Sequence, residues 1–316
     1  DWDALVEDAQ EMTRRGKEAH DFALSLQEGG SHRKEDDVAK AKALDNFRWI
    51  AAREALTPYD LSALARVKLH LNRKDEALAL LESLDSHAAW RGSARLLYDR
   101  ALALQSAQRY PEAAATWRQL ADTARPGVRE HYLATAERAD ALAEAWRVEQ
   151  EARSRAAVRD DLPVVLLSTT RGSIVIQLLP EHVPEAVRHF LDLVDRRTYP
   201  GTRFHRVEGD FLVQGGDPIS REDLTRAGSG QGPTTVTAEL NETLGYFRGA
   251  VAFARSIARV NGSQFFVLTS PKPGLAEEGY TVFGHVLAGM DVVDRIQYGD
   301  TLIDVRRIDT PPAKEE

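Results

Sequence analysis

The sequence predicts a multidomain α + β protein, with an all-helical first half and a β-rich second half. Its 316 residues exceed the length of a typical single domain. Up to about Arg159 the chain is rich in Ala, Leu, Glu and Arg, which favour helices, and its apolar residues recur at helical spacing. From Leu162 onwards, short β-branched runs alternate with glycine-rich turns, as in strands. We therefore expect one domain over residues 1–159 and a second over residues 160–316.

The composition excludes several classes of function. Hydrophobic residues make up 43% and charged residues 28% of the chain, which is ordinary for a protein with a packed core. The net charge of −8 offers no global electrostatic basis for binding nucleic acid. The absence of cysteine excludes disulfides, thiol nucleophiles and thiolate metal sites. No apolar run approaches the roughly 18 residues of a membrane span.

Two stretches of the first half resemble each other, LHLNRKDEALALLESL (69–84) and LQSAQRYPEAAATWRQL (104–120). Each predicts a helix, a short polar turn and a second helix that starts near a Glu-Ala pair. The pairs begin at Glu76 and Glu112, an offset of 36 residues, close to the roughly 34-residue period of tetratricopeptide repeats. The tryptophan, glycine and tyrosine positions usual in that family are not cleanly filled, so we describe this half as tetratricopeptide-like.

Further helices are expected on either side of these two hairpins. Thr57 and Pro58 predict a helix start, with threonine as the N-cap and proline in the first turn. Other helices are expected over 1–28, with a break around Gly29, and over roughly 126–157. Two interpretations of the helical half remain open: a packed accessory domain without activity, or a concave surface that binds a partner peptide or supports dimerisation.

The second half opens with VVLLSTTRGSIVIQLL (164–179), which predicts a β-hairpin. VPEAVRHFLDLVDRR (183–197) then predicts an amphipathic helix that starts at a proline, and short strands follow as far as Ile308. Many short strands with one or two helices favour a closed β-barrel.

The common catalytic patterns are missing from the sequence. Nine histidines are scattered without the spacing of metal ligands. Ser263 lies in NGSQFF, which is not a Gly-x-Ser-x-Gly elbow, and GSGQGP (228–233) lacks the lysine of a phosphate loop. We therefore expect neither a metal nor a cofactor.

Three motifs remain, FHRVEGDFLVQGGD (204–217), FARSIARVNGSQFF (253–266) and GYTVFGHVLAGMDVVDRI (279–296). In this order, residues 163–308 resemble the cyclophilins, which are peptidyl-prolyl cis/trans isomerases. The resemblance implies an eight-stranded antiparallel β-barrel capped by two helices. It also implies proline-containing peptides and unfolded protein clients as partners.

The resemblance assigns roles by position. Arg206 matches the catalytic arginine, with Gln214 and Phe211 beside it. The peptide-binding residues that it implies are Leu212, Ala254, Arg255, Ser256, Gln264, Phe266, Leu275 and Tyr280. Relatives more often have methionine at the Leu212 position, asparagine at the Arg255 position and histidine at the Tyr280 position.

These residue types suit a rotation about an X–Pro bond, in which no bond breaks and no nucleophile, acid, base or metal is needed. A guanidinium stays charged and presents several donors, so Arg206 can hydrogen-bond the prolyl carbonyl while the amide twists. Apolar side chains such as Phe266 can hold the pyrrolidine ring, and Gln214 and Gln264 can hold the preceding backbone. Phe204 and Phe265 are expected in the core, and His205 is expected to be structural.

Gly274 stands where many relatives, especially eukaryotic ones, have a tryptophan that helps to hold cyclosporin, so we expect weak cyclosporin binding. This departure, Tyr280 and a chain that starts at Asp1 without methionine favour a processed protein of a bacterial envelope over a cytoplasmic one. The absence of cysteine is compatible with an oxidising compartment but does not demand one.

Three hypotheses about function follow. The first is a prolyl isomerase that assists protein folding. The second is a proline-peptide-binding chaperone or scaffold, and the third is a helical half that recruits clients or partners to the barrel.

Overall fold

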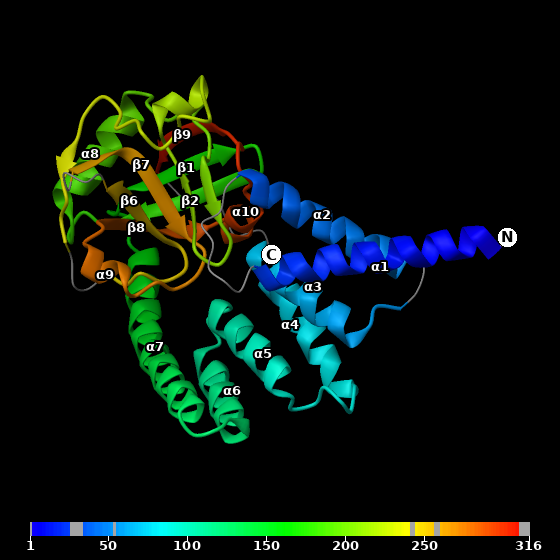
Figure 1. The fold of residues 1–316 in the computed structure, drawn as a ribbon. Coiled ribbons are helices and arrows are strands. Elements are labelled where there is room, and N and C mark those ends of the chain that lie inside the picture. Colours follow the sequence, from blue (N-terminus) through cyan, green and yellow to red (C-terminus); the bar gives the residue numbers. More distant parts are fainter. Residues whose placement is uncertain (1, 26–33, 53–54, 241–243, 256–259, 310–316) are drawn as a thin grey trace. The chain divides into compact units, whose positions relative to one another are not determined.

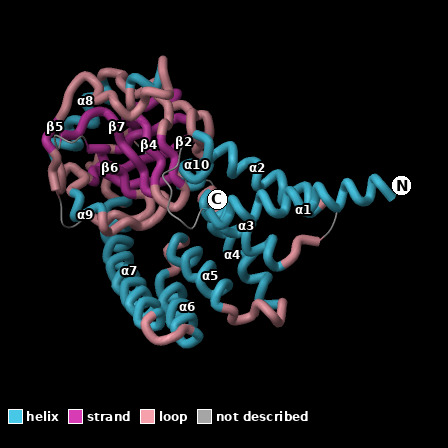
Figure 2. Tube along the Cα trace, viewed as in Figure 1, coloured by secondary structure: helices cyan, strands magenta, loops and turns pink. Residues whose placement is uncertain are grey.

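The computed structural model describes residues 2–25, 34–52, 55–240, 244–255 and 260–309 (Figure 1). The break expected around Gly29 lies outside these residues. The chain divides into two compact units, Asp1–Ala143 and Glu144–Glu316. All the strands belong to the second unit, as the colouring of Figure 2 shows. The division lies inside helix α7 (Val128–Ala157) rather than between residues 159 and 160.

The first unit consists of helices and contains the two expected hairpins. Its elements are α1 (Trp2–Ser25), α2 (Lys34–Ala51), α3 (Pro58–His70), α4 (Lys74–Ser83), η2 (Leu84–Ser86), α5 (Ala94–Ser106), α6 (Tyr110–Thr123) and the first half of α7. The predicted N-cap is confirmed, because Thr57 and Asp60 form a reciprocal capping box at the start of α3. In the described part of the chain, no helix has the length and apolar character needed to cross a bilayer.

The helices of the two hairpins start at positions that also differ by 36 residues. Helices α3 and α5 begin at Pro58 and Ala94, and the second helices of the hairpins begin at Lys74 and Tyr110. The turn between the helices contains a residue with positive φ in both hairpins, Asn72 at 59° and Gln108 at 63°. Small residues allow the helices to approach closely, since Ala101, Ala113 and Ala114 are fully buried. The two hairpins therefore repeat one local structure.

The second unit is built on one curled antiparallel sheet. Its strands are β1 (Val164–Thr169), β2 (Gly172–Leu178), β3 (Arg206–Glu208), β4 (Leu212–Gly215), β5 (Val236–Thr237), β6 (Ala250–Arg255), β7 (Val260–Leu268), β8 (Val282–Ala288) and β9 (Leu302–Ile308). Eight of them follow the order β3-β4-β7-β6-β8-β2-β1-β9, and the two-residue β5 pairs with β7. The eight-stranded architecture expected from the sequence is confirmed.

Irregular backbone joins the two ends of this sheet. The amide of Phe204, just before β3, donates to the carbonyl of Asp300, just before β9, at 2.9 Å. The amide of Leu302 donates to the carbonyl of Thr202, also at 2.9 Å. These bonds close the curl without a regular pairing of β3 with β9.

Two helices complete the interior of the barrel. Helix α8 (Pro184–Asp195) contributes Phe190 and α10 (Met290–Arg295) contributes Val293 to the same apolar cluster as the strands. Phe190 packs against Phe265 and Phe283, with ring centroids 5.8 and 4.8 Å apart. Phe204 and Phe265 are buried in this cluster, as expected. Two short elements, η3 (Pro218–Arg221) and α9 (Leu275–Glu278), lie in the connections.

The last turns of α7 are bound to the barrel through polar contacts. Arg153 forms an ion pair with Glu149 at 2.7 Å and donates from Nη1 to the carbonyl of Arg248 at 2.9 Å. Trp146 packs on Phe247 with ring centroids 5.1 Å apart. Both members of the ion pair are largely buried, so removing one would leave an uncompensated charge in the interface. This explains why residues after Ala143 belong to the strand-rich unit.

His285 on β8 lies beneath this end of α7. Its side chain is buried, and within the described part of the chain its Nε2 has no hydrogen-bond partner. Burial, together with the positive charge of Arg153, lowers the pKa of His285 from 6.5 to about 3. Burial also lowers the pKa of His189 and of His205. These side chains are therefore neutral in the folded protein near neutral pH.

Below pH 6.5 the histidines of the unfolded chain bind protons that the buried histidines of the folded protein do not bind. The part of the folding stability that depends on neutral His285 is therefore fully present above this pH and is lost as the pH falls. We expect His285 alone to reduce the free energy of unfolding of the second unit by about 2 kcal/mol between about pH 7.5 and pH 5. Urea unfolding, followed by hydrogen exchange of β6 and β8 amides, measures this loss. In His285→Gln the loss should be smaller by that amount, whereas the exposed His87→Gln should match the parent; equal losses in all three proteins would contradict the assignment.

Candidate active site

The site lies on the outer face of strands β3, β4, β7 and β6, and the strand register assembles it. Arg206 pairs with Gln214, Gln214 with Phe266, and Phe266 with Ala252. Directly opposed residues on neighbouring strands point to the same face of a sheet. The motifs around residues 206, 214 and 266 therefore meet along one line across four strands.

Alternation along the strands separates two apolar clusters. On β7, Phe265 and Val267 belong to the barrel interior, whereas Phe266 and Leu268 belong to a second cluster outside it. The buried members of this outer cluster are Leu212, Tyr246, Ala250, Ala252, Phe266, Leu268, Leu275 and Val282. The outer face of the sheet, which is usually polar in a barrel, is apolar here and forms the floor of a pocket.

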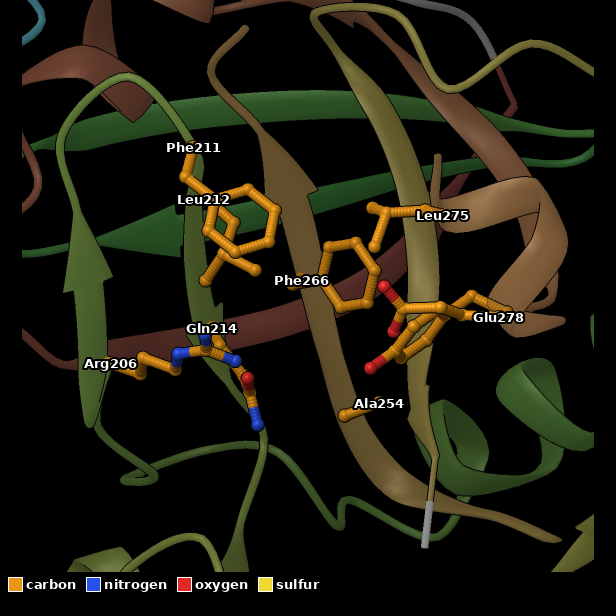
Figure 3. Close-up of a pocket in the computed structure, with 9 residues that line it drawn as sticks. Arg206, Phe211, Leu212, Gln214, Ala254, Phe266, Leu275 and Glu278 are labelled. Atoms are coloured by element: carbon orange, nitrogen blue, oxygen red, sulfur yellow. The ribbon is translucent and has the colours of Figure 1, made fainter. Parts of the chain in front are cut away.

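The pocket has a volume of about 340 Å³ and is shown in Figure 3. Its lining residues are Arg206, Phe211, Leu212, Gln214, Ala254, Phe266, Leu275, Glu278 and Tyr280. All of these except Glu278 were expected from the sequence. Among the described residues, no group of three or more His, Asp or Glu side chains could hold a metal ion.

Three expected residues are not among those that line the pocket. Gln264 lies behind Gln214 and is buried. The backbone of Arg255 pairs with Asn261 at the end of β6, but its side chain lies outside the described part of the structure. Ser256 also lies outside the described residues.

Arg206 lies at the mouth of the pocket with its guanidinium half-exposed. Its Nε donates to Glu208 at 2.7 Å, and its Cζ is 5.5 Å from the centroid of the Phe211 ring. Glu208 was not recognised from the sequence, although a residue two positions along the same strand shares a face with Arg206. Within the described residues, neither Nη of Arg206 has a hydrogen-bond partner. The two Nη groups are therefore available to donate to a bound ligand.

A chain of amide hydrogen bonds orients Gln214. Gln264 donates from Nε2 to the carbonyl of Gly230 at 2.6 Å, and Gln214 donates from Nε2 to Oε1 of Gln264 at 2.9 Å. A backbone carbonyl can only accept, so it sets the direction of both side-chain amides. In the described structure, Oε1 of Gln214 receives no hydrogen bond. This leaves an acceptor in the pocket wall next to the donors of Arg206.

Asp217 holds the 228–230 loop, whose Gly230 carbonyl accepts the first hydrogen bond of this chain of amides. Its fully buried carboxylate accepts from the amides of Gly228 at 2.6 Å, Gly230 at 3.0 Å and Ile219 at 2.9 Å. The backbone reaches Asp217 through Gly216, whose φ is 82° and where a Cβ would lie 2.7 Å from the carbonyl of Ser263. Only glycine fits such a position without strain.

The apolar wall on the other side is set by α9 and Tyr280. The tyrosine ring meets Phe266 edge-on, with centroids 5.5 Å apart, and its carbonyl accepts from the hydroxyl of Tyr246 at 2.6 Å. Gly279, with φ at 74°, ends α9 and turns the chain into Tyr280. Leu275, at the start of the same helix, is buried beside them. These groups enclose a slot suited to a small apolar ring.

Comparisons with known proteins agree with this geometry. A family model described as "Cyclophilin type peptidyl-prolyl cis-trans isomerase/CLD" matches residues 164–312. Peptidyl-prolyl cis-trans isomerase-like 1 of Rhizopus delemar is 38% identical over 138 residues, which are 42% of this chain and 78% of that protein. Peptidyl-prolyl cis-trans isomerase-like 1 of Homo sapiens is 35% identical over 153 residues, 46% of this chain and 87% of that protein. The chain belongs to the cyclophilin-type peptidyl-prolyl cis/trans isomerase family.

Two further similarities come from other organisms. Peptidyl-prolyl cis-trans isomerase cypE of Dictyostelium discoideum is 37% identical over 141 residues, 42% of this chain and 83% of that protein. A crystal structure of a cyclophilin type isomerase of Cryptosporidium parvum aligns with a TM-score of 0.43 and 26% identity, covering 48% of this chain and 99% of that chain. The three curated relatives described here are eukaryotic and give no support to the expectation of a bacterial protein.

Asp217→Asn tests the chain of amides. The asparagine would present an NH₂ group to backbone N–H donors, so the 228–230 loop should move and Gln214 should lose its fixed orientation. We expect the affinity for a short Ala-Pro peptide to fall about fivefold to tenfold, a change of about 1 to 1.4 kcal/mol. Peptide titration by NMR measures the affinity, and hydrogen exchange at Gly228 and Gly230 reports the loop.

Asp223→Asn is the matched control, because the hydrogen bonds that its carboxylate accepts in the described structure come from its own turn, from Thr225 and the backbone of Arg226. Peptide affinity should not change in this variant. Faster exchange at Gly228 in Asp217→Asn without any loss of peptide affinity would show that the loop does not orient Gln214.

Proposed function

We propose that this chain accelerates cis/trans rotation about X–Pro bonds in peptides and unfolded proteins. One observation carries the proposal: within the described structure, Arg206 presents two Nη groups without hydrogen-bond partners at the mouth of an apolar pocket, beside an Oε1 of Gln214 that receives no hydrogen bond there. A donor, an acceptor and an apolar slot are the groups that a prolyl peptide requires. They are also sufficient, because the reaction breaks no covalent bond.

In this mechanism Arg206 acts on the twisted amide. As the X–Pro bond rotates, the prolyl nitrogen loses conjugation and its lone pair becomes a hydrogen-bond acceptor. The guanidinium donates to the carbonyl of the proline and lies near this lone pair, so it stabilises the twisted state more than either planar state. Glu208 holds Nε and so keeps the fork in one orientation, with both Nη groups directed to the substrate.

The other pocket residues hold one side of the X–Pro bond and leave the other side free to rotate. Phe211, Leu212, Phe266 and Leu275 hold the pyrrolidine ring by apolar contact. Oε1 of Gln214 accepts an N–H from the peptide backbone, while Gln264 acts through Gln214 as a positioning residue rather than as a direct contact. With the ring held in place, rotation is confined to the other side of the bond.

Arg206→Ala should lower kcat/KM for a short X–Pro peptide about 10²-fold to 10³-fold, the loss typical of removing one preorganised donor at a charge-developing atom. Arg206→Lys should recover only part of the activity, because an ammonium lacks the planar fork. The measurement is the cis-to-trans rate on the peptide. Arg188→Ala, an exposed arginine paired with Glu185, is the control and should match the parent.

A second candidate function is a proline-peptide-binding chaperone or scaffold. The 36-residue repeat of the first unit favours it, since stacked helical hairpins commonly present a surface for a partner. We propose that this unit is tetratricopeptide-like and recruits clients to the isomerase. A chain that bound the X–Pro peptide without accelerating its rotation would support the second function instead of the first. Refolding of a proline-limited protein by the full chain and by a fragment from Glu144 onwards would test recruitment.

We also propose weak binding of cyclosporin, because Gly274 leaves the rim of the pocket open. A Cβ built on Gly274 meets no atom within 4 Å, and its φ of −60° suits any residue. Gly274→Trp should therefore fold normally and bury an indole against a large apolar ligand, strengthening cyclosporin binding about tenfold or more. Calorimetric titration measures this change. Gly274→Ala is too short to reach the ligand and should bind as weakly as the parent.

A further inference from the structure

Glu278 is the one residue of the pocket wall that the sequence did not indicate. It is the last residue of α9, three positions after Leu275. Residues three apart lie on the same face of a helix, so the turn that buries Leu275 in the pocket also directs Glu278 to its rim. The adjacent Glu277 is exposed and does not line the pocket.

The carboxylate of Glu278 is free to interact with a ligand. Its side chain is exposed, and in the described part of the chain it forms no ion pair or hydrogen bond. The cation of Lys272 lies over the ring of Phe211, with its Nζ 5.5 Å from the ring centroid. Figure 3 shows Arg206 and Glu278 on opposite sides of Phe266. The pocket therefore has a positive side next to Phe211 and a negative side at Glu278.

We propose that Glu278 makes the pocket select prolines that are flanked by a basic side chain, lysine or arginine. The inference rests on the proposed function, which places the proline ring between these two sides. A residue next to the proline crosses the rim, and a basic side chain there brings its cation to the Glu278 carboxylate. An acidic side chain at the same place meets a like charge.

Exposure limits the size of the effect. Solvent and salt screen a pair at the rim, and such pairs change an affinity by a small factor. We expect a lysine peptide to have a kcat/KM about threefold higher than the matching glutamate peptide, with glutamine between them. In about 1 M salt the preference should disappear, since the screening length falls to about 3 Å.

A charge reversal tests the proposal. Two peptide series carry lysine, glutamine or glutamate immediately before or immediately after the proline. In at least one series Glu278→Lys should invert the lysine-to-glutamate ratio, and Glu278→Gln should bring it close to one. Glu277→Lys, which makes the same change in charge one residue away, should keep the parental ratio. An unchanged ratio in Glu278→Lys, or an equal inversion in Glu277→Lys, would overturn the proposal.

The design separates this inference from the proposed function. If the parent accelerates the glutamine peptides but turns over the lysine and glutamate peptides equally, the isomerase stands and the selectivity fails. If no peptide is accelerated, the proposed function fails. The ratio of the dissociation constants of the lysine and glutamate peptides, measured by NMR titration in the same variants, then decides the role of Glu278.

Discussion

The pairing register of β4 with β7 is the constraint on which the site depends. Gln214 opposes Phe266. In this register Phe265 packs inside the barrel and Phe266 packs outside it. A slip by one residue would exchange the two faces, place Gln214 in the apolar interior and remove the pocket floor. The large aromatic core around Phe190 disfavours any such slip. Packing inside the barrel therefore secures the geometry of the groove outside it.

Local patterns in the sequence were enough to predict a helical first half and a β-rich second half, because periods of two and of about 3.6 residues are set by short-range geometry. The count of eight strands came from the resemblance to the cyclophilins. Local patterns were not enough to locate the division between the units. Helix α7 is continuous, and helical periodicity does not reveal which of two units its end packs against. Arg153 and Glu149 lie in a strongly charged stretch of the sequence, RVEQEARSR, yet their side chains are largely buried against the barrel. Such a long-range ion pair has no local signature.

The residues that line the pocket were predicted better than the hydrogen bonds that its polar residues form. Residues such as Phe211 and Leu275 lie in motifs, so a resemblance could place them. Gln264 lies in a motif too, yet the structure engages its amide with Gly230 and Gln214, so it supports the wall instead of lining the pocket. Glu208 lies two positions after Arg206, where strand alternation puts it on the same face, but only the structure shows that it forms an ion pair with Nε of Arg206.

The arrangement suits a reaction that moves no proton. Gln214 is oriented by Gln264 and the Gly230 carbonyl, and that loop by the buried Asp217, so each polar group is held before a ligand arrives. His205, whose Nε2 lies 3.4 Å from Nε2 of Gln214, has a lowered pKa because it is buried, so it stays neutral. Among the described residues, the groups that remain for a substrate are the Nη edge of the Arg206 guanidinium, Oε1 of Gln214 and an apolar slot. In the proposed isomerase reaction, stabilising a twisted amide requires preorganised groups rather than reactive ones, so we propose that the fold contributes to the rate mainly by holding these groups in place.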